Sequence, residues 1–208
     1  MAVLQGSLLD LADDIEVRPL AGAVQRTELG DGAWVDRRLA WVGGADDLFT
    51  ALRRDVPWFA ERRQMYDAVV DTPRLLAFYG EADLLPHLAL EECRDALSAH
   101  YADELGEPFV TAGLCLYRDG QDSVAWHGDR IGRSREQDTM VAILSLGAPR
   151  DLALRPRDGG TSVRIPSGHG DLLVMGGSCQ RTWDHCVPKT TTPVGPRISV
   201  QFRVRGVR

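Results

Sequence analysis

The sequence predicts an α+β protein that is mainly β, with a sandwich or jelly roll preceded by a mixed, partly helical extension. After Pro108, short apolar segments alternate with glycine, proline and aspartate about every ten residues, which is typical of a sandwich or jelly roll. Alternating strands and helices would give a different pattern. Because 44% of the 208 residues are hydrophobic, the chain can bury a sizeable core.

Before Pro108 the elements are short and mixed. In chain order we predict a strand over 33–42 between glycines, a helix over 45–54, and strands over 58–66 and 74–79. The helix prediction rests on Leu48, Phe49 and Leu52, which share one helical face. A longer helix is predicted over 84–105, where apolar residues recur at roughly helical spacing: Leu88, Leu90, Cys93, Leu97 and Tyr101.

The residues after Pro108 predict a run of short strands. These are Phe109–Arg118, Ser123–His127, Thr139–Leu146, Asp151–Arg155, Ser162–Ile165, Asp171–Met175, Thr182–Cys186 and Arg197–Val204. We therefore divide the chain into an N-terminal extension, residues 1–108, and a β core, residues 109–208, which together form one compact unit.

Charge and cysteine content narrow the class of protein. The net charge of −6 argues weakly against a protein that coats nucleic acid. Acidic residues predominate up to residue 126 and basic residues after it, so the C-terminal part can present a basic face, unless its arginines are spread over several surfaces. The four cysteines have no paired or finger-like spacing, which favours reduced thiols. Without a secretory pattern over residues 1–14 or a long apolar segment, we expect a cytoplasmic protein.

Two histidines and one aspartate form a candidate metal site. His127 and Asp129 are two residues apart at the end of a predicted strand, where such side chains point to the same side. His185 lies at the end of another predicted strand, which a closed β-structure can bring beside them. Two imidazoles and one carboxylate are the ligand set of non-haem Fe(II) oxygenases. By itself, however, a His-x-Asp pair is also common on protein surfaces.

Two arginines on the last predicted strand strengthen the metal interpretation. Arg197 and Arg203 are six residues apart and face the same side, opposite to Ile198, Val200 and Phe202. A buried guanidinium needs an anionic partner, and a metal-bound dicarboxylate would provide one. The alternative is that these are exposed strand arginines in an arginine-rich chain.

In combination, these residues resemble the AlkB family of Fe(II)- and 2-oxoglutarate-dependent dioxygenases, particularly its members that demethylate nucleic acids. The similarity extends from about Pro57 to Arg203. Its motifs are Tyr117-Arg118-Asp119-Gly120, Asp122 to Asp129, Trp183-Asp184-His185, Pro196-Arg197 to Phe202-Arg203 and, upstream, Pro73-Arg74 with Phe78-Tyr79-Gly80.

The resemblance implies a fold, a cofactor and a reaction. The fold is a double-stranded β-helix, the jelly-roll form, and the extension carries the substrate-lid region. Fe(II) is bound by the catalytic residues His127, Asp129 and His185. Tyr117, Arg197 and Arg203 bind 2-oxoglutarate, and O2 is the second co-substrate. The implied reaction is oxidative demethylation of alkylated nucleobases in DNA or RNA, which releases formaldehyde, succinate and CO2.

Departures from the family pattern concern the substrate more than the iron chemistry. Cys115 and Ser199 stand where relatives often have asparagine, and Arg130 stands where many have an acidic residue. We expect Trp126, Arg130 and Trp183 to contact the substrate, although a tryptophan beside a buried strand is more often part of the core.

Two other functions remain open at this point. The same iron chemistry can hydroxylate a small molecule, a nucleotide or a protein side chain, or the jelly roll can be a binding module without activity. The expected partner is alkylated DNA or RNA, single-stranded or with a flipped base, and no membrane. The sequence does not determine the oligomeric state, and a monomer is the expectation.

Overall fold

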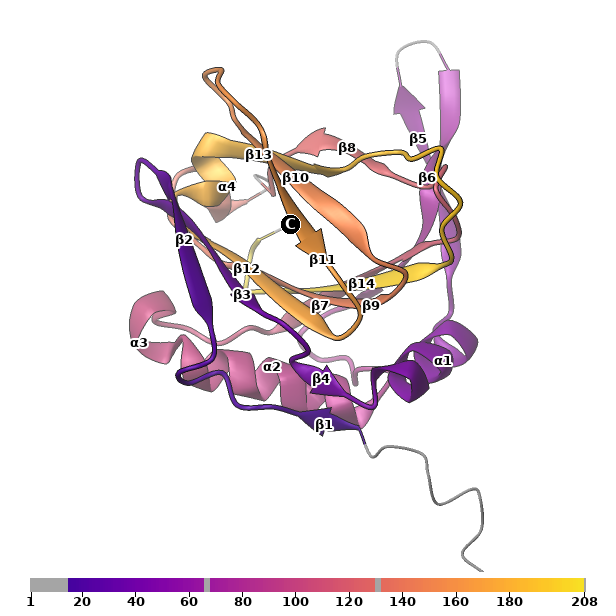
Figure 1. Cartoon of the computed structure of the whole chain (residues 1–208), viewed down its shortest axis with the longest axis horizontal. Helices are drawn as coiled ribbons and strands as arrows, with labels where there is room; N and C mark the ends of the chain where they lie inside the picture. Colours follow the sequence, from indigo (N-terminus) through magenta and orange to yellow (C-terminus); the bar gives the residue numbers. More distant parts are fainter. Residues whose placement is uncertain (1–14, 66–67, 130–131, 208) are drawn as a thin grey trace, which may run out of the picture.

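The protein is built around two facing antiparallel sheets (Figure 1). The computed structural model describes residues 15–65, 68–129 and 132–207. Within these residues the larger sheet has eight strands, in the order β2 (Gln25–Gly30), β3 (Ala33–Arg38), β12 (Asp171–Gly177), β9 (Val141–Gly147), β14 (Arg197–Arg203), β7 (Thr111–Tyr117), β6 (Ala68–Tyr79) and β5 (Phe59–Met65). The smaller sheet has the order β11 (Val163–Ser167), β10 (Arg150–Pro156), β13 (Trp183–Val187) and β8 (Val124–His127). A separate short pair joins β1 (Glu16–Val17) to β4 (Val42–Gly43).

The strands after residue 108 form the predicted jelly roll. Strands β7, β9, β12 and β14 belong to the larger sheet, whereas β8, β10, β11 and β13 belong to the smaller one. The chain therefore passes repeatedly from one sheet to the other, as in a double-stranded β-helix. The predicted fold class is confirmed, and each of the strands predicted in this region is present within a few residues of its expected bounds.

Helices cover the outer face of the larger sheet (Figure 1). Helix α1 (Ala45–Asp55) contacts β9 and buries Leu48 and Leu52 completely. Helix α2 (Leu88–His100) and the short α3 (Ala102–Leu105) follow on the same side. Because β9 packs against α1 on one face and against the interior on the other, residues 141–146 are buried without alternation. Each described helix falls short of the length and apolar character needed to cross a lipid bilayer.

The N-terminal extension contributes strands to both edges of the larger sheet. β3 pairs with β12 at one edge, and β6 pairs with β7 at the other. These additions widen the sheet beyond the jelly roll and place β6 beside the strand that carries Tyr117, with β5 on the far side of β6. The division of the chain at residue 108 stays a prediction. Strands β6 and β7, which lie on the two sides of this boundary, pair with each other.

Two predicted elements have different bounds in the structure. The strand predicted over 33–42 ends at Arg38, because Ala40 has a φ of 46° and its N–H donates to the Asp171 carboxylate at 2.8 Å. The helix predicted over 84–105 begins at Leu88, because the His87 ring caps it by accepting a hydrogen bond from the Ala89 N–H at 3.1 Å. It ends at His100, before α3.

Several elements had no sequence prediction. Strand β2 is polar and mostly exposed at the edge of the sheet, so it lacks an apolar pattern. The part of β6 before Arg74, helix α4 (Cys179–Thr182) and a 3₁₀ turn at Arg133–Arg135 were also not predicted.

Candidate metal centre

Three side chains meet between the two sheets, as the sequence predicted. His127 ends β8 and is the direct cross-strand partner of His185 on β13, so their ring centroids are 4.2 Å apart. Asp129 follows in the loop, with its Oδ1 3.6 Å from His127 Nε2. One potential ligand atom from each residue lies within 4.8 Å of the others. This separation allows all three to bind a single metal ion.

The surroundings of both imidazoles are compatible with metal binding. The Nδ1 of His127 lies 2.8 Å from the Ala125 carbonyl oxygen, and an N–H there donates to it and leaves Nε2 free on the side of Asp129. His185 is buried, and burial together with the nearby His127 lowers its pKa to about 4. It is therefore neutral near pH 7, as a ligand must be.

Asp129 is held as a charged carboxylate. Burial by itself raises its pKa, but the charges of Arg203, His185 and His127 outweigh burial and lower that pKa below the usual value. Arg203 Nε and Nη2 both lie 2.7 Å from Oδ2, which leaves Oδ1 on the side of the histidines. The backbone N–H of Asp129 donates to Gln180 Oε1 at 3.2 Å.

A cavity of about 80 Å³ lies beside the candidate metal ligands. Its lining includes both histidines together with Tyr117, Arg197 and Arg203. The two arginines thus face the same interior space, as their spacing on the last strand predicted. Ile143, Leu152 and Val187 supply apolar walls that limit access of water.

Arg197 is the chemically unusual residue of this cavity, because it is a cation that is only 2% exposed. Its Nη2 donates to Ser145 Oγ at 2.7 Å, and its Cζ lies 5.3 Å from the centre of the Tyr117 ring. Its Nε and Nη1 are buried without a hydrogen-bond partner among the described residues. Burial lowers its pKa from the usual value, but an arginine remains cationic. Such a group is costly to bury unless an anion pairs with it.

Further arginines around the cavity were not predicted as site residues. Arg150 donates to the carbonyl oxygens of Asp119, Asp122 and Pro188 at 2.6–3.1 Å, and so joins the loops on both sides of the site. Arg74 lines the cavity and donates to the Ser123 carbonyl at 3.2 Å. Arg74 belongs to the upstream motif of the family resemblance but was not assigned a role there, and Arg150 lies in an ordinary strand sequence that contains no signal for this role.

A polar group between the two predicted arginines was also missed. Gln201 lines the cavity, and its Nε2 donates to the Ser199 carbonyl at 2.9 Å. The thiol of Cys115 lies 3.7 Å from Gln201 Oε1. The period of two that identified Arg197 and Arg203 would also have identified Gln201. Cys115 and Ser199, which depart from the family pattern, therefore belong to the cavity.

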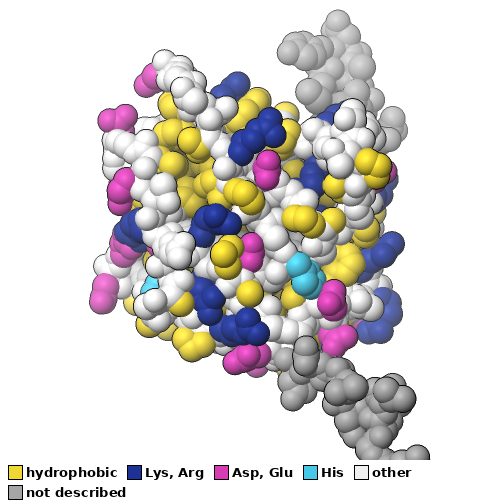
Figure 2. All heavy atoms as spheres, in the orientation of Figure 1, with side chains coloured by type: hydrophobic (Ala, Val, Ile, Leu, Met, Phe, Trp, Pro, Cys, Tyr) yellow, Lys and Arg dark blue, Asp and Glu magenta, His cyan; other side chains and the backbone are white. Residues whose placement is uncertain are grey.

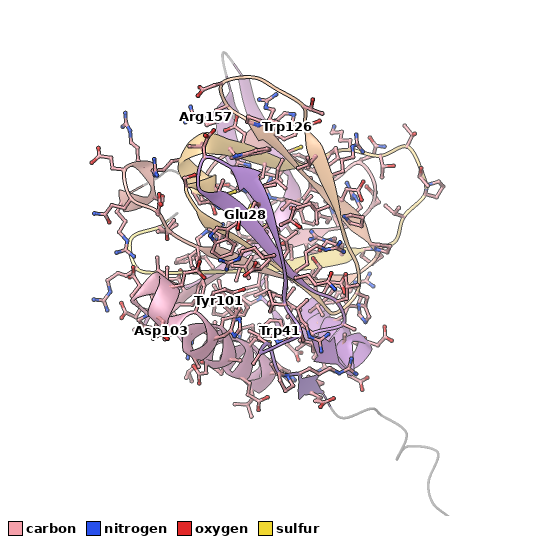
Figure 3. All side chains as sticks on the ribbon, turned by 60° about the vertical axis from the view of Figure 1, so that its left-hand side comes forward. Glu28, Trp41, Tyr101, Asp103, Trp126 and Arg157 are labelled. Atoms are coloured by element: carbon pink, nitrogen blue, oxygen red, sulfur yellow. The ribbon has the colours of Figure 1, made fainter. Side chains whose placement is uncertain are left out.

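Of the predicted substrate contacts, neither Trp126 nor Trp183 lines the cavity beside the candidate metal ligands. Trp183 is 7% exposed and belongs to the hydrophobic core, which favours the packing interpretation. Trp126 is 36% exposed, lies at the same end of the molecule as Arg157 (Figure 3), and has the Arg155 guanidinium 4.4 Å above its ring. Arg130 lies outside the described residues. Binding of substrate by these residues stays a prediction.

The charge on the surface is spread out on the face that Figure 2 shows. Basic side chains lie there at several separate places among hydrophobic ones. On this face, therefore, basic side chains are dispersed rather than gathered at one place.

Comparison with known proteins finds one matching family model and several similar proteins. The family model described as the 2OG-Fe(II) oxygenase superfamily matches residues 80–203. The chain is 35% identical over 178 residues to alpha-ketoglutarate-dependent dioxygenase alkB homolog 3 of Bos taurus, which covers 76% of this chain and 61% of the relative. It is 30% identical over 182 residues to DNA oxidative demethylase ALKBH2 of Homo sapiens, which covers 76% and 68%.

The fold of this chain is similar to that of a solved structure. The structure of OsALKBH1 superimposes with a TM-score of 0.62 at 13% identity, and covers 86% of this chain and 99% of that one.

The chain spans about three fifths of the length of the bovine alkB homolog 3. The chain belongs to the 2OG-Fe(II) oxygenase superfamily and, within it, to the AlkB family. The resemblance found in the sequence is thereby confirmed.

The residues present fit the two groups that this family uses. The donor set of two imidazoles and one carboxylate suits Fe(II) and leaves coordination positions for other ligands. The unpartnered Nε and Nη1 of Arg197 suit a carboxylate, which a guanidinium binds through two N–H groups. The cavity that adjoins both features is where 2-oxoglutarate would bind.

Proposed function

We propose that this protein oxidatively demethylates alkylated nucleobases in DNA or RNA. His127, Asp129 and His185 would hold Fe(II), and Arg197 with Tyr117 would hold the far carboxylate of 2-oxoglutarate. When bound, these groups and O2 supply the oxidation of an N-methyl group, with succinate, CO2 and formaldehyde as products. The observation that carries the proposal is a metal-ligand triad beside a buried arginine that has two unpartnered N–H groups.

The chain's own residues position and protect these groups. Arg203 fixes the Asp129 carboxylate through Oδ2, so that Oδ1 is available to the metal. Ser145 fixes the Arg197 guanidinium from one side and leaves two of its nitrogens for the co-substrate. The apolar walls of the cavity exclude water, which protects a reactive oxidant from side reactions.

The names of the relatives support the substrate class. One relative is a DNA oxidative demethylase, and another is an alpha-ketoglutarate-dependent dioxygenase of the alkB type. For this chain we propose an alkylated nucleic acid as substrate, presented as a single strand or with the base flipped out. We also propose a cytoplasmic location and a monomeric state.

The test is formaldehyde release from oligonucleotides of one sequence that carry a single N-methylated base. Reactions contain Fe(II), 2-oxoglutarate and O2, and parallel reactions omit each of them or use His185→Ala. Equal amounts of formaldehyde and succinate, dependent on all three additions and on His185, are expected. Succinate without formaldehyde from any DNA or RNA would contradict demethylation and favour hydroxylation of a smaller substrate.

A further inference from the structure

A second hollow adjoins the cavity beside the candidate metal ligands. This groove has a volume of about 460 Å³, compared with about 80 Å³ for the cavity. Among the described residues, His127 and His185 line the cavity only. The residues that line both spaces are Arg74, Cys115, Gln201 and Arg203. These four residues therefore form the boundary between the cavity and the groove.

A row of paired residues crosses this boundary at Gln201. On β9, Ile143 is the direct partner of Gln201 and lines the cavity only. On the other side, Gln201 pairs with Gly113 on β7, and Gly113 pairs with Phe78 on β6. Gly113 and Phe78 line the groove only. Because the side chains of directly paired residues lie on the same face of a sheet, Gln201 stands where the cavity ends and the groove begins.

Glycine at position 113 leaves room for the Gln201 side chain. A Cβ built at Gly113 would lie 3.3 Å from Gln201 Oε1 and 3.1 Å from Arg203 Nη1. A side chain at this position would therefore press on both polar groups. The Gln201 amide thus lies over β7, in the space that a side chain at position 113 would take.

The amide of Gln201 is held by hydrogen bonds at both of its ends. Its Nε2 donates to the carbonyl oxygen of Ser199 at 2.9 Å and also to the Ser199 hydroxyl oxygen. The Cys115 thiol, a weak donor, donates to Oε1 over a distance of 3.7 Å. Fixing a glutamine side chain costs conformational entropy, which these hydrogen bonds offset. The side chain therefore keeps one position between the two spaces.

The Gln201 side chain is independent of the metal ligands, whereas its neighbour Arg203 is not. Arg203 Nε and Nη2 both lie 2.7 Å from Asp129 Oδ2. Arg203 Nη1 donates at 3.5 Å to the backbone carbonyl of Gln201, a group that any residue at this position retains. In the hydrogen bonds of the structure, the Gln201 side chain contacts Ser199 and Cys115. It can therefore be shortened without removing a hydrogen bond to a metal ligand.

We propose that Gln201 closes the co-substrate cavity towards the groove. Its side chain, held by Ser199 and Cys115, slows the passage of 2-oxoglutarate between the cavity and the groove, and so keeps a bound molecule beside the metal. The inference rests on the proposed function, because that function places 2-oxoglutarate in the cavity. It adds a residue that controls how fast the co-substrate enters and leaves without binding it.

The experiment measures how fast N-oxalylglycine, a non-reacting analogue of 2-oxoglutarate, binds to immobilised protein loaded with Mn(II). Surface plasmon resonance gives the association rate constant, the dissociation rate constant and, from their ratio, Kd. In Gln201→Ala we expect both rate constants to rise about tenfold and Kd to stay within about threefold of the wild-type value. The reason is that a wall raises the barrier between the free and bound states and leaves the energies of those states unchanged.

Two other variants and a control test how the wall is built. Gln201→Met keeps most of the side-chain volume but loses the amide, so both rate constants should rise less than in Gln201→Ala. Cys115→Ala removes the partner of Oε1, and both rate constants should change in the same direction. Gln121→Ala is the matched control, because Gln121 is exposed and lines neither space, and its rate constants should equal those of the wild type.

Three results would overturn the inference. A Kd that rises about tenfold or more in Gln201→Ala, with an unchanged association rate constant, would mean that Gln201 binds the co-substrate itself. Wild-type rate constants in both Gln201 variants, even with a lower Tm, would mean that this side chain has only a structural role. A wild type that binds Mn(II) but not N-oxalylglycine would refute the proposed co-substrate site and, with it, this inference.

Discussion

Substituting Arg197 by methionine removes a buried cation and keeps much of its volume. In the wild type two nitrogens, Nε and Nη1, are without partners among the described residues and suit the far carboxylate of 2-oxoglutarate. Each hydrogen bond to a charged group contributes about 1.5–3 kcal/mol, so two such bonds contribute about 3–6 kcal/mol. The KM for 2-oxoglutarate should therefore rise about 10²- to 10⁴-fold.

The assay is succinate formation as a function of 2-oxoglutarate concentration, with Mn(II) binding measured in parallel. Mn(II) binding should be retained, because Arg197 contacts none of the three metal ligands in the hydrogen bonds of the structure. Thermal unfolding gives a second readout. Adding excess 2-oxoglutarate to the Mn(II)-bound protein should raise the Tm of the wild type further, but leave that of Mn(II)-bound Arg197→Met almost unchanged.

The same substitution should not destabilise the protein without co-substrate. Arg197 has no anionic partner among the described residues, so an apolar side chain of similar size removes the cost of burying its charge. Arg205→Met is the control, since Arg205 is exposed and its ion pair with Glu81 lies on the surface. A KM within about threefold of the wild-type value in Arg197→Met would refute the reasoning, because the predicted loss is at least a hundredfold.

Three other predictions concern the metal site and the stability of the fold. Asp129→Ala should abolish Mn(II) binding measured by calorimetry, and an affinity equal to that of the wild type would show that the ligand assignment is wrong. Phe202 is completely buried, so Phe202→Ala should lower the free energy of unfolding in urea by about 3–5 kcal/mol, and a loss below about 1 kcal/mol would contradict its place in the core. Burial raises the pKa of Asp122, but hydrogen bonds from Arg118 lower that pKa by more than burial raises it. The pKa of Asp122 in the folded protein therefore lies below the usual value. The stability that this pair contributes is present above the usual carboxyl pKa and is lost as the pH falls. Asp122→Asn should therefore flatten the decline in unfolding free energy between about pH 5 and 2. An equal decline in the variant and the wild type would count against a stabilising role of this ion pair.

The elements predicted best are those whose pattern is local. The strands after Pro108 were recovered because each combines a short apolar segment with turn residues. That His127 and Asp129 lie close together followed from their spacing of two residues, whereas their role as metal ligands stays a prediction. The pairing of His185 with His127 depends on the register between β13 and β8, which a single sequence does not contain. The family resemblance supplied that information instead.

The features that were missed depend on register and burial. The row that joins Phe78, Gly113 and Gln201 comes from three strands far apart in the sequence. Trp183 precedes a metal ligand by two residues, yet it packs into the core, and no local pattern separates these two roles. Strand β2 is an exposed polar edge whose pairing with β3, rather than its own composition, makes it a strand.

A crystal structure with Mn(II) and a non-reacting analogue of 2-oxoglutarate tests the arrangement of the site most directly. We expect one ion bonded to His127, Asp129 and His185, with the far carboxylate of the analogue on Nε and Nη1 of Arg197. An ion bound elsewhere, or an analogue that leaves those two nitrogens without a partner, would contradict the proposed site.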